Sequence, residues 1–243
     1  MGGYGIMISA GLVLFPTFKD EELREKVRQM LHPEEIKTAD AFVSDIRRKS
    51  FLHGRIAGKM AIEKIFSDVP SAEIQITTGA LGEPYISNLQ QPYGVSIAHG
   101  DLLNAGLCFP LTFTMGVDVE SITERNRAII PLVLSDSEKE MCSREENELE
   151  LLHVIWTAKE AAGKAIRLGF RVPHEWYEID NLETLTFEPR LIHRCRFKHL
   201  TMFTALSVAI PGGVMSIAFP TDKETEKLIN GLLQQFEGPG ATI

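Results

Sequence analysis

Gly116-Val117-Asp118-Val119-Glu120 alternates small or apolar residues with two carboxylates. A period of two predicts a β-strand, so Asp118 and Glu120 project from the same face of that strand. Two acids on one strand face can hold a divalent cation such as Mg²⁺, which prefers oxygen ligands and keeps several waters. Acids that alternate on a solvent-exposed strand show the same pattern, so the pentapeptide alone leaves both interpretations open.

A long helix is predicted further along the chain, over about residues 147–168. Trp156, Glu160 and Lys164 are four residues apart and therefore lie along one face of that helix. An exposed Glu160–Lys164 pair would contribute only ~0.2–0.5 kcal/mol to helix stability. The small residues at 161–163 favour a functional face, because the glycine among them costs ~1 kcal/mol relative to alanine in a helix. We expect another group to approach this face closely.

A second long helix is predicted from about residue 40 to 66. At ~100° per residue, Arg48, Arg55 and Lys59 fall within roughly 40° of one another on it. From residue 47 to 64 six basic residues stand with one acid, which favours a phosphate-bearing or acidic partner at this place. A solvated helix face is the alternative.

Four ordered segments resemble the motifs of the Sfp-type 4′-phosphopantetheinyl transferases. That family has a GKPY-like turn, an NISHS-like strand, a G(I/V)DxE strand and a W(S/T)xKExxxK helix. The corresponding segments here are Gly82-Glu83-Pro84-Tyr85, Ser96-Ile97-Ala98-His99-Gly100, Gly116-Val117-Asp118-Val119-Glu120 and Trp156 to Lys164. This chain departs from the family at Glu83, where lysine is frequent, and at three small or polar neighbours of His99.

The predicted order of strands and helices indicates two α+β halves, each with a long helix and a small sheet. Ala57-Gly58-Lys59 recurs as Ala162-Gly163-Lys164, a weak sign of internal duplication. The resemblance implies the same fold class, α+β with two similar lobes related by a pseudo-twofold axis, each a small, mostly antiparallel sheet with a long helix. Residues 1–112 would form an N-terminal lobe that binds the coenzyme A nucleotide. Residues 113–243 would form a C-terminal lobe with the metal site and the catalytic helix.

The resemblance implies a Mg²⁺-dependent enzyme that transfers 4′-phosphopantetheine from coenzyme A to a serine of an apo acyl or peptidyl carrier protein, releasing 3′,5′-ADP. Asp118, Glu120 and Glu160 would hold the metal ion. The catalytic residues would be Asp118, Glu160 as the base and Lys164 at the diphosphate. The residues implied in coenzyme A binding are Arg48, Arg55, Lys59, Thr78, Gly82, Pro84, His99 and Lys164.

The composition is that of an ordinary folded protein, with 44% hydrophobic and 24% charged residues, which excludes a disordered chain or a collagen. A net charge of −8 argues against a general nucleic-acid-binding surface. Three cysteines without CxxC spacing fit a reducing, cytoplasmic setting. The apolar stretch from Gly5 to Phe15 is too short to span a membrane. Because two lobes in one chain form their interface internally, we expect a monomer. From the net charge and the short apolar stretch we expect no nucleic-acid or membrane partner.

Two other functions stay open on the sequence. One is a non-catalytic module that binds coenzyme A or a carrier protein, and the other is a metal-dependent phosphodiesterase. For docking of an acidic carrier, Arg194, Arg196 and Lys198 are candidates, since they alternate along a predicted strand. A charged edge strand that resists aggregation is an equal alternative for these cations.

Overall fold

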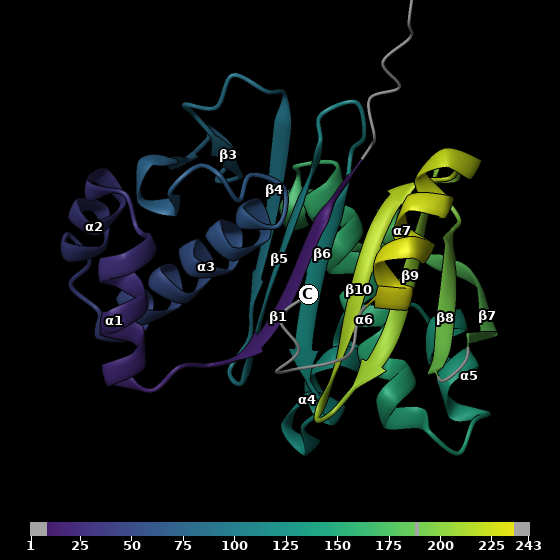
Figure 1. Cartoon of the computed structure of the whole chain (residues 1–243). Helices are drawn as coiled ribbons and strands as arrows, with labels where there is room; N and C mark the ends of the chain where they lie inside the picture. The colour runs from purple at the N-terminus through teal and green to yellow at the C-terminus, as the bar shows by residue number, and fades with distance from the viewer. Residues whose placement is uncertain (1–8, 188–189, 236–243) are drawn as a thin grey trace, which may run out of the picture.

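The computed structural model describes residues 9–187 and 190–235, and antiparallel sheets form its framework (Figure 1). The first sheet has three strands in the order β1-β5-β4, the second has five in the order β6-β10-β9-β8-β7, and β2 pairs with β3. The strand bounds are β1 Gly11–Pro16, β2 Ile76–Thr78, β3 Pro84–Ile86, β4 Tyr93–His99, β5 Leu103–Pro110, β6 Gly116–Ser121, β7 Ile179–Phe187, β8 Arg190–Phe197, β9 Phe203–Ile210 and β10 Gly213–Pro220.

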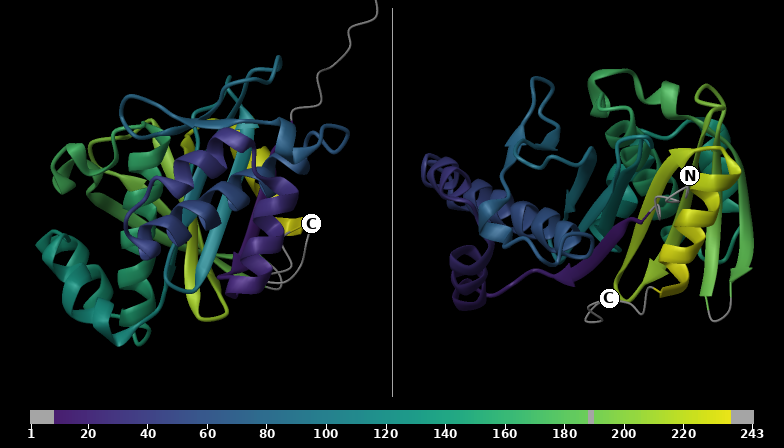
Figure 2. Two further views of the ribbon diagram at one scale, coloured as in Figure 1. Left: turned by 90° about the vertical axis from the view of Figure 1, so that its left-hand side faces the viewer. Right: turned by 45° about the horizontal axis from the view of Figure 1, so that its top comes forward.

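Helices lie before, between and after these strands. Their bounds are α1 Asp20–Met30, α2 Pro33–Asp40, α3 Asp45–Glu63, α4 Glu124–Ile129, α5 Asp136–Ser143, α6 Glu148–Ala165 and α7 Lys223–Gln235. Figure 2 shows the N-terminal helices and the five-stranded sheet on opposite sides of the molecule. No helix within the described ranges is both long and apolar enough to cross a membrane.

Strand alternation places one core between the two sheets and another beneath each long helix. On β1, Leu12 and Leu14 face the core between the sheets, whereas Val13 and Phe15 pack toward α3. On β6, Val117 and Val119 face the same shared core. The alternate residues of β6 therefore face α6, which packs on the other side of the second sheet.

The two halves repeat the same order of elements. The strand order β1-β5-β4 in the first sheet matches β6-β10-β9 in the second, and each half places its long helix, α3 or α6, against these strands. A Cβ on Gly11 would collide with the carbonyl oxygen of Ala61 in α3, and a Cβ on Gly116 would collide with that of Ala161 in α6. Glycine is thus needed at equivalent places where a strand crosses its helix.

A buried ion pair occurs at the same place in both halves. Lys59 of α3 lies 3.0 Å from Glu35, and Lys159 of α6 lies 2.9 Å from Glu138. Both glutamates complete a capping box at the start of a short helix. Both also accept a hydrogen bond from the backbone N–H of a following segment, at Ile76 and Ile179.

These observations confirm the predicted fold class of two similar α+β units with antiparallel sheets and long helices. They correct the register of the predicted repeat, because Lys59 corresponds to Lys159 and not to Lys164. The expected helix over residues 40–66 is shorter and runs from Asp45 to Glu63, because α2 ends at Asp40 and the Ser44 side chain caps the start of α3. The start of the expected strand at Ile6 lies outside the described residues.

Candidate functional site

Asp118 and Glu120 lie on the face of β6 that α6 covers, as the alternating pattern predicts. Asp118 is buried, whereas Glu120 is half-buried. Asp118 is the register partner of Ser216 on β10, and the Ser216 hydroxyl lies 2.6 Å from Thr157 Oγ1 of α6. Residues paired across antiparallel strands point to the same face, so Asp118 also points toward α6.

Lys164 joins the last turn of α6 to the middle of β6. Its Nζ atom donates to Oδ1 of Asp118 at 2.7 Å. The other oxygen of Asp118, Oδ2, is buried and has no hydrogen-bond partner within the described residues. The close packing at Gly116 makes this contact possible, because it brings the backbones of β6 and α6 together.

Glu160 and Glu120 are electrostatically coupled to Asp118. Burial and, after it, the charge of Asp118 raise the pKa of Glu160 to about 8, and Lys164 opposes the shift. Burial and the Asp118 charge likewise raise the pKa of Glu120 to about 7, opposed by a hydrogen bond from Trp156. Neighbouring carboxylates that resist joint ionisation favour either a proton or a cation among them.

His99 at the end of β4 connects this acid cluster to α3. Its Nδ1 atom lies 3.2 Å from the Ser50 hydroxyl, and a Cβ on Gly54 would lie 3.3 Å from its ring. Burial lowers the pKa of His99 and the nearby charge of Lys164 lowers it further, whereas Asp118 raises it. Side chains from both halves of the chain therefore meet at one place.

Arg55 and Thr78 form a second polar contact in the N-terminal half. Nη2 of Arg55 donates to the Thr78 hydroxyl at 2.8 Å, and the guanidinium lies 4.5 Å from the centre of the Phe51 ring. Burial lowers the pKa of Arg55, and Glu35 opposes that shift. Nε of Arg55 is buried without a partner among the described residues.

The structure corrects the role predicted for Lys59. Its side chain is fully buried, pairs with Glu35 and donates to the carbonyl oxygens of Ser71 and Ile74. The prediction used only the angular positions of residues around the helix, and these do not tell a buried cation from an exposed one. Lys59 therefore cannot reach a phosphate at the surface.

Arg48 lies in the first turn of α3, next to α1 and α2. It stands 4.0 Å from Asp40 and lines a cavity of about 390 Å³ formed by α1, α2 and the start of α3. Of the three cations predicted to share one face, Arg48 is partly exposed, Arg55 is bound to Thr78 and Lys59 is buried. The predicted cationic face is not continuous.

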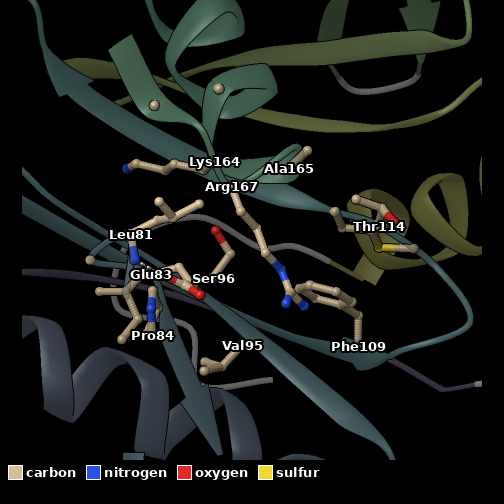
Figure 3. A pocket seen from close by; sticks show the side chains of 15 residues that line it. Leu81, Glu83, Pro84, Val95, Ser96, Phe109, Thr114, Lys164, Ala165 and Arg167 are labelled. Atoms are coloured by element: carbon tan, nitrogen blue, oxygen red, sulfur yellow. Dashed lines mark hydrogen bonds between the residues drawn. The ribbon is translucent and has the colours of Figure 1, made fainter. Parts of the chain in front are cut away.

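A cavity of about 220 Å³ opens between the β2–β3 turn and the end of α6 (Figure 3). Gly82 and Pro84 of the turn line one side, and Lys164 lines the other. Leu81, Val95, Ile97, Phe109 and Met115 supply apolar walls. The predicted coenzyme A residues Gly82, Pro84 and Lys164 thus line one cavity.

Asp118, Glu120 and Glu160 fit a cation by their chemistry. Asp118 has a buried oxygen without a partner among the described residues, and burial together with the Asp118 charge raises the pKa values of both glutamates. Within residues 9–187 and 190–235, no group of three or more His, Cys, Asp or Glu side chains is gathered closely enough to form a ready metal site. In this conformation the Lys164 ammonium supplies a positive charge to the cluster.

The cations suggested for carrier docking are paired within the chain. Arg194 bonds Glu226, and Arg196 lies 3.9 Å from Glu183. Lys198 lies 2.8 Å from Glu178, whose pKa this hydrogen bond helps to lower to about 2. These cations are thus paired with acids of the same chain, and the edge-strand alternative is wrong because β8 lies between β9 and β7 in the sheet.

Three features of the site region could not be identified from sequence motifs. Ser50 contacts His99 across 49 residues of sequence, which no local pattern indicates. Arg171 donates from beyond α6 to the carbonyl oxygen of Leu81 in the cavity turn. Arg167 has a positive φ of 59°, a conformation that sequence periodicity does not predict.

Comparison with known proteins gives one family match. Residues 114–211, which contain β6, α6 and their motifs, match the model of the 4′-phosphopantetheinyl transferase superfamily. A solved holo-(acyl-carrier-protein) synthase from Bacillus anthracis str. Ames, in complex with CoA (3′,5′-ADP), is 19% identical with a TM-score of 0.37, covering 42% of this chain and 93% of that chain. The holo-ACP-synthase from Plasmodium yoelii is 16% identical with a TM-score of 0.34, covering 42% of this chain and 91% of that chain. No curated protein matches in sequence.

Proposed function

Because residues 114–211 carry the signature of the 4′-phosphopantetheinyl transferase superfamily, as the sequence motifs predicted, we propose that the protein transfers 4′-phosphopantetheine from coenzyme A to a carrier-protein serine. The observation that carries the proposal is the contact between Lys164 and Asp118, which joins the family's strand and helix motifs. His99, from the upstream motif, adds to the same cluster through its electrostatic coupling to both residues.

In the proposed reaction, the serine hydroxyl oxygen attacks the phosphorus that bears the pantetheine arm. A new P–O bond forms, the bond to the bridging diphosphate oxygen breaks, and 3′,5′-ADP leaves with that electron pair. The protein must neutralise charge on the diphosphate, hold the hydroxyl in line and accept its proton.

Lys164 is the proposed contact for the diphosphate. Its side chain is partly exposed, at 28%, whereas its partner Asp118 is nearly buried, at 7%. The Lys164 side chain is therefore partly open to solvent, and a point charge of this kind suits a phosphate oxygen. His99 and the Arg55–Thr78 pair would extend the phosphate contacts toward the N-terminal half.

Glu160 is the proposed base for the serine proton. Burial raises its pKa to about 8, so its carboxylate is a stronger base than that of an ordinary glutamate. Such a base functions when nearby positive charge favours its ionised form, and Lys164 already acts in that direction. Asp118, Glu120 and Glu160 would hold Mg²⁺, which when bound would neutralise charge on the diphosphate.

The finer parts of this function are also proposals. We infer a cytoplasmic monomer whose N-terminal lobe, residues 1–112, binds the nucleotide of coenzyme A and whose C-terminal lobe, residues 113–243, carries the catalytic helix. The three cysteines support a reducing compartment because all are buried, free thiols. The acceptor is an acyl or peptidyl carrier protein of a pathway still to be determined.

Intact-mass spectrometry of a panel of apo carrier proteins tests the proposal. Each carrier is incubated with the protein, coenzyme A and Mg²⁺, and transfer adds one phosphopantetheine to the carrier. A phosphodiesterase would instead release free phosphopantetheine without changing the carrier's mass. A wild-type protein that binds coenzyme A but modifies no carrier in a broad panel would indicate a binding module and contradict the proposal.

A further inference from the structure

Arg167 occupies a position at the end of α6 that usually belongs to glycine. The N–H of Leu168 donates to the carbonyl of Gly163, and the N–H of Arg167 donates to that of Lys164, both at 3.1 Å. This pair of hydrogen bonds defines a Schellman motif, in which the residue after the C-cap has a left-handed backbone. Arg167 is that residue, with φ of 59°.

An arginine in this conformation is strained relative to glycine. A side chain in the left-handed region costs on the order of 1 kcal/mol, because Cβ crowds the following carbonyl. The other positive-φ residues in residues 9–187 and 190–235 are the glycines Gly82, Gly169 and Gly212. Non-glycine residues held in such conformations cluster at ligand clamps and active sites. There the function of the side chain accounts for a residue whose backbone is strained.

The Arg167 side chain reaches into the cavity beside Lys164. Figure 3 shows it crossing from the end of α6 toward the ring of Phe109, while the Lys164 side chain extends in another direction. Arg167 is exposed, and within the described ranges no hydrogen bond or ion pair of its guanidinium is found. The strained residue thus places an unpaired guanidinium plane over a cavity whose walls are mostly apolar, with Glu83, Ser96 and Thr114 as polar members.

We propose that Arg167 is a specificity-determining residue that stacks on the adenine ring of coenzyme A in this cavity. The inference rests on the proposed function and adds to it the recognition of the nucleotide base. A guanidinium is planar and weakly hydrated, so it stacks on aromatic faces, which a lysine ammonium does not do. An apolar cavity of ~150 Å³ holds benzene, and the about 220 Å³ found here has room for a larger, two-ring group.

The walls of the cavity suit one end of coenzyme A. Leu81, Pro84 and Val95 present apolar surface opposite Arg167, and Lys164 stands at the rim with its charge. A base between the apolar walls and Arg167 would direct the attached phosphates toward Lys164 and the acid cluster. The pantetheine arm, which has no aromatic ring, gains nothing from a guanidinium plane.

Three variants separate a role in binding from a role in folding. Arg167→Gly removes the side chain and relieves the strain, so the melting temperature is expected to rise or stay unchanged. Its dissociation constant for coenzyme A, measured by calorimetry, is expected to increase at least fivefold. Arg167→Lys keeps the charge but lacks the plane and should show most of that loss. Arg144→Ala is the control, because it removes an exposed arginine whose partner among the described residues is Glu140.

Four ligands identify the group that Arg167 contacts. The loss on Arg167→Gly should be equal for coenzyme A, 3′,5′-ADP and dephospho-coenzyme A, and absent for 4′-phosphopantetheine, which lacks the nucleotide. A loss that disappears with dephospho-coenzyme A would assign Arg167 to the 3′-phosphate and overturn stacking. A loss with 4′-phosphopantetheine would place the arm in the cavity and also overturn it.

Failure of this inference can be distinguished from failure of the proposed function. If the wild-type protein binds coenzyme A and Arg167→Gly binds it equally well, the role of Arg167 is wrong while the function stands. If the wild-type protein binds neither coenzyme A nor 3′,5′-ADP, the proposed function fails and the inference with it.

Discussion

Nζ of Lys164 and Oδ1 of Asp118 lie 2.7 Å apart across 46 residues of sequence. The pair joins the end of a helix to the middle of a strand, beside two glutamates whose pKa values are raised. The ammonium of Lys164 therefore lies among three acids, Asp118, Glu120 and Glu160, whose negative charges repel one another. Any cation or anionic substrate that enters changes the partners of both residues.

Asp118→Asn should abolish most of the transfer activity with little change in fold. The substitution removes the negative charge of Asp118, which pairs with Lys164 and raises the pKa values of Glu160 and Glu120. We expect the rate to fall on the order of 100-fold, as for removal of one preorganised electrostatic group. We also expect both glutamates to titrate at lower pH, which carboxyl-labelled NMR measures. Asp180→Asn, at an exposed site on β7, serves as the control. Unchanged titration of Glu160 would show that the two acids are not coupled.

The metal-free protein should lose stability as the pH rises toward 8. Glu120 and Glu160 have folded pKa values of about 7 and about 8, above the ordinary value of 4.5. The folded state therefore keeps protons that the unfolded chain releases, so this stability is complete below pH 4.5 and is lost as the pH rises through 7 and 8. Melting temperatures across this range measure the effect.

The double variant Glu120→Gln/Glu160→Gln is the matched control for this pH dependence. It lacks both titrating carboxyls, so its melting temperature should vary less between pH 5 and 8. The lowered pKa of His99 acts in the opposite direction at low pH in both proteins and cancels in the comparison. Mg²⁺ should raise the melting temperature of the wild type more at pH 8 than at pH 6. Equal slopes for the two proteins would contradict the assignment.

Lys159→Met should destabilise the protein by ~3–5 kcal/mol, because it leaves the carboxylate of Glu138 buried without its cation. Adding Glu138→Gln should recover part of this loss, since the amide oxygen can still accept from the N–H of Ile179. Denaturant unfolding of the double-mutant cycle gives the coupling. Lys59→Met and Glu35→Gln form the equivalent cycle in the first half and should give a coupling of the same sign.

The exposed pair of Arg144 and Glu140 provides the comparison for these cycles. Both side chains are largely in water, at 69% and 63% exposure, so removing Arg144 should change the free energy of unfolding by less than ~0.5 kcal/mol. A coupling between Lys159 and Glu138 as small as this would mean that the buried pair does not hold α5 against α6.

Gly116→Ala should lower both stability and activity. Its Cβ would collide with the carbonyl oxygen of Ala161, so β6 and α6 must move apart by enough to disturb the Lys164–Asp118 contact. Overpacking of this kind costs typically ~1–3 kcal/mol. Gly231→Ala in α7 is the matched control, because nothing lies within 4 Å of its added Cβ. Gly231→Ala should stabilise the protein by ~0.5–1 kcal/mol. Thermal unfolding measures the stability of both variants.

The sequence allowed the strand and helix motifs to be predicted because both are local patterns. The alternation around Asp118 and the four-residue spacing from Glu160 to Lys164 each lie within one element, so geometry alone assigns their faces. The contact between these elements depends on how β6 and α6 pack, which spacing does not specify. The motif order of a known family supplied that step.

Lys59 shows why part of the site could not be predicted. Its angular position beside Arg55 is correct, but Glu35 lies on a different helix and neutralises it inside the protein. Position on a helix predicts direction, whereas burial depends on what the tertiary structure brings to that face. The capping box at Glu138 follows the readable Ser-x-x-Glu pattern, whereas the one at Glu35 begins with a histidine, and the lysine partners of both come from elsewhere in the chain.

The equivalence of Gly11 with Gly116 has a consequence for stoichiometry. Counting two and four residues along each strand pairs Val13 with Asp118 and Phe15 with Glu120. Val13 and Phe15 are buried against α3, so the symmetry-related crevice is filled with hydrocarbon where its counterpart has acids. Of the two symmetry-related crevices beneath the long helices, the one under α6 has the acids in the described residues, so a titration with nucleotide should saturate at a single molar equivalent.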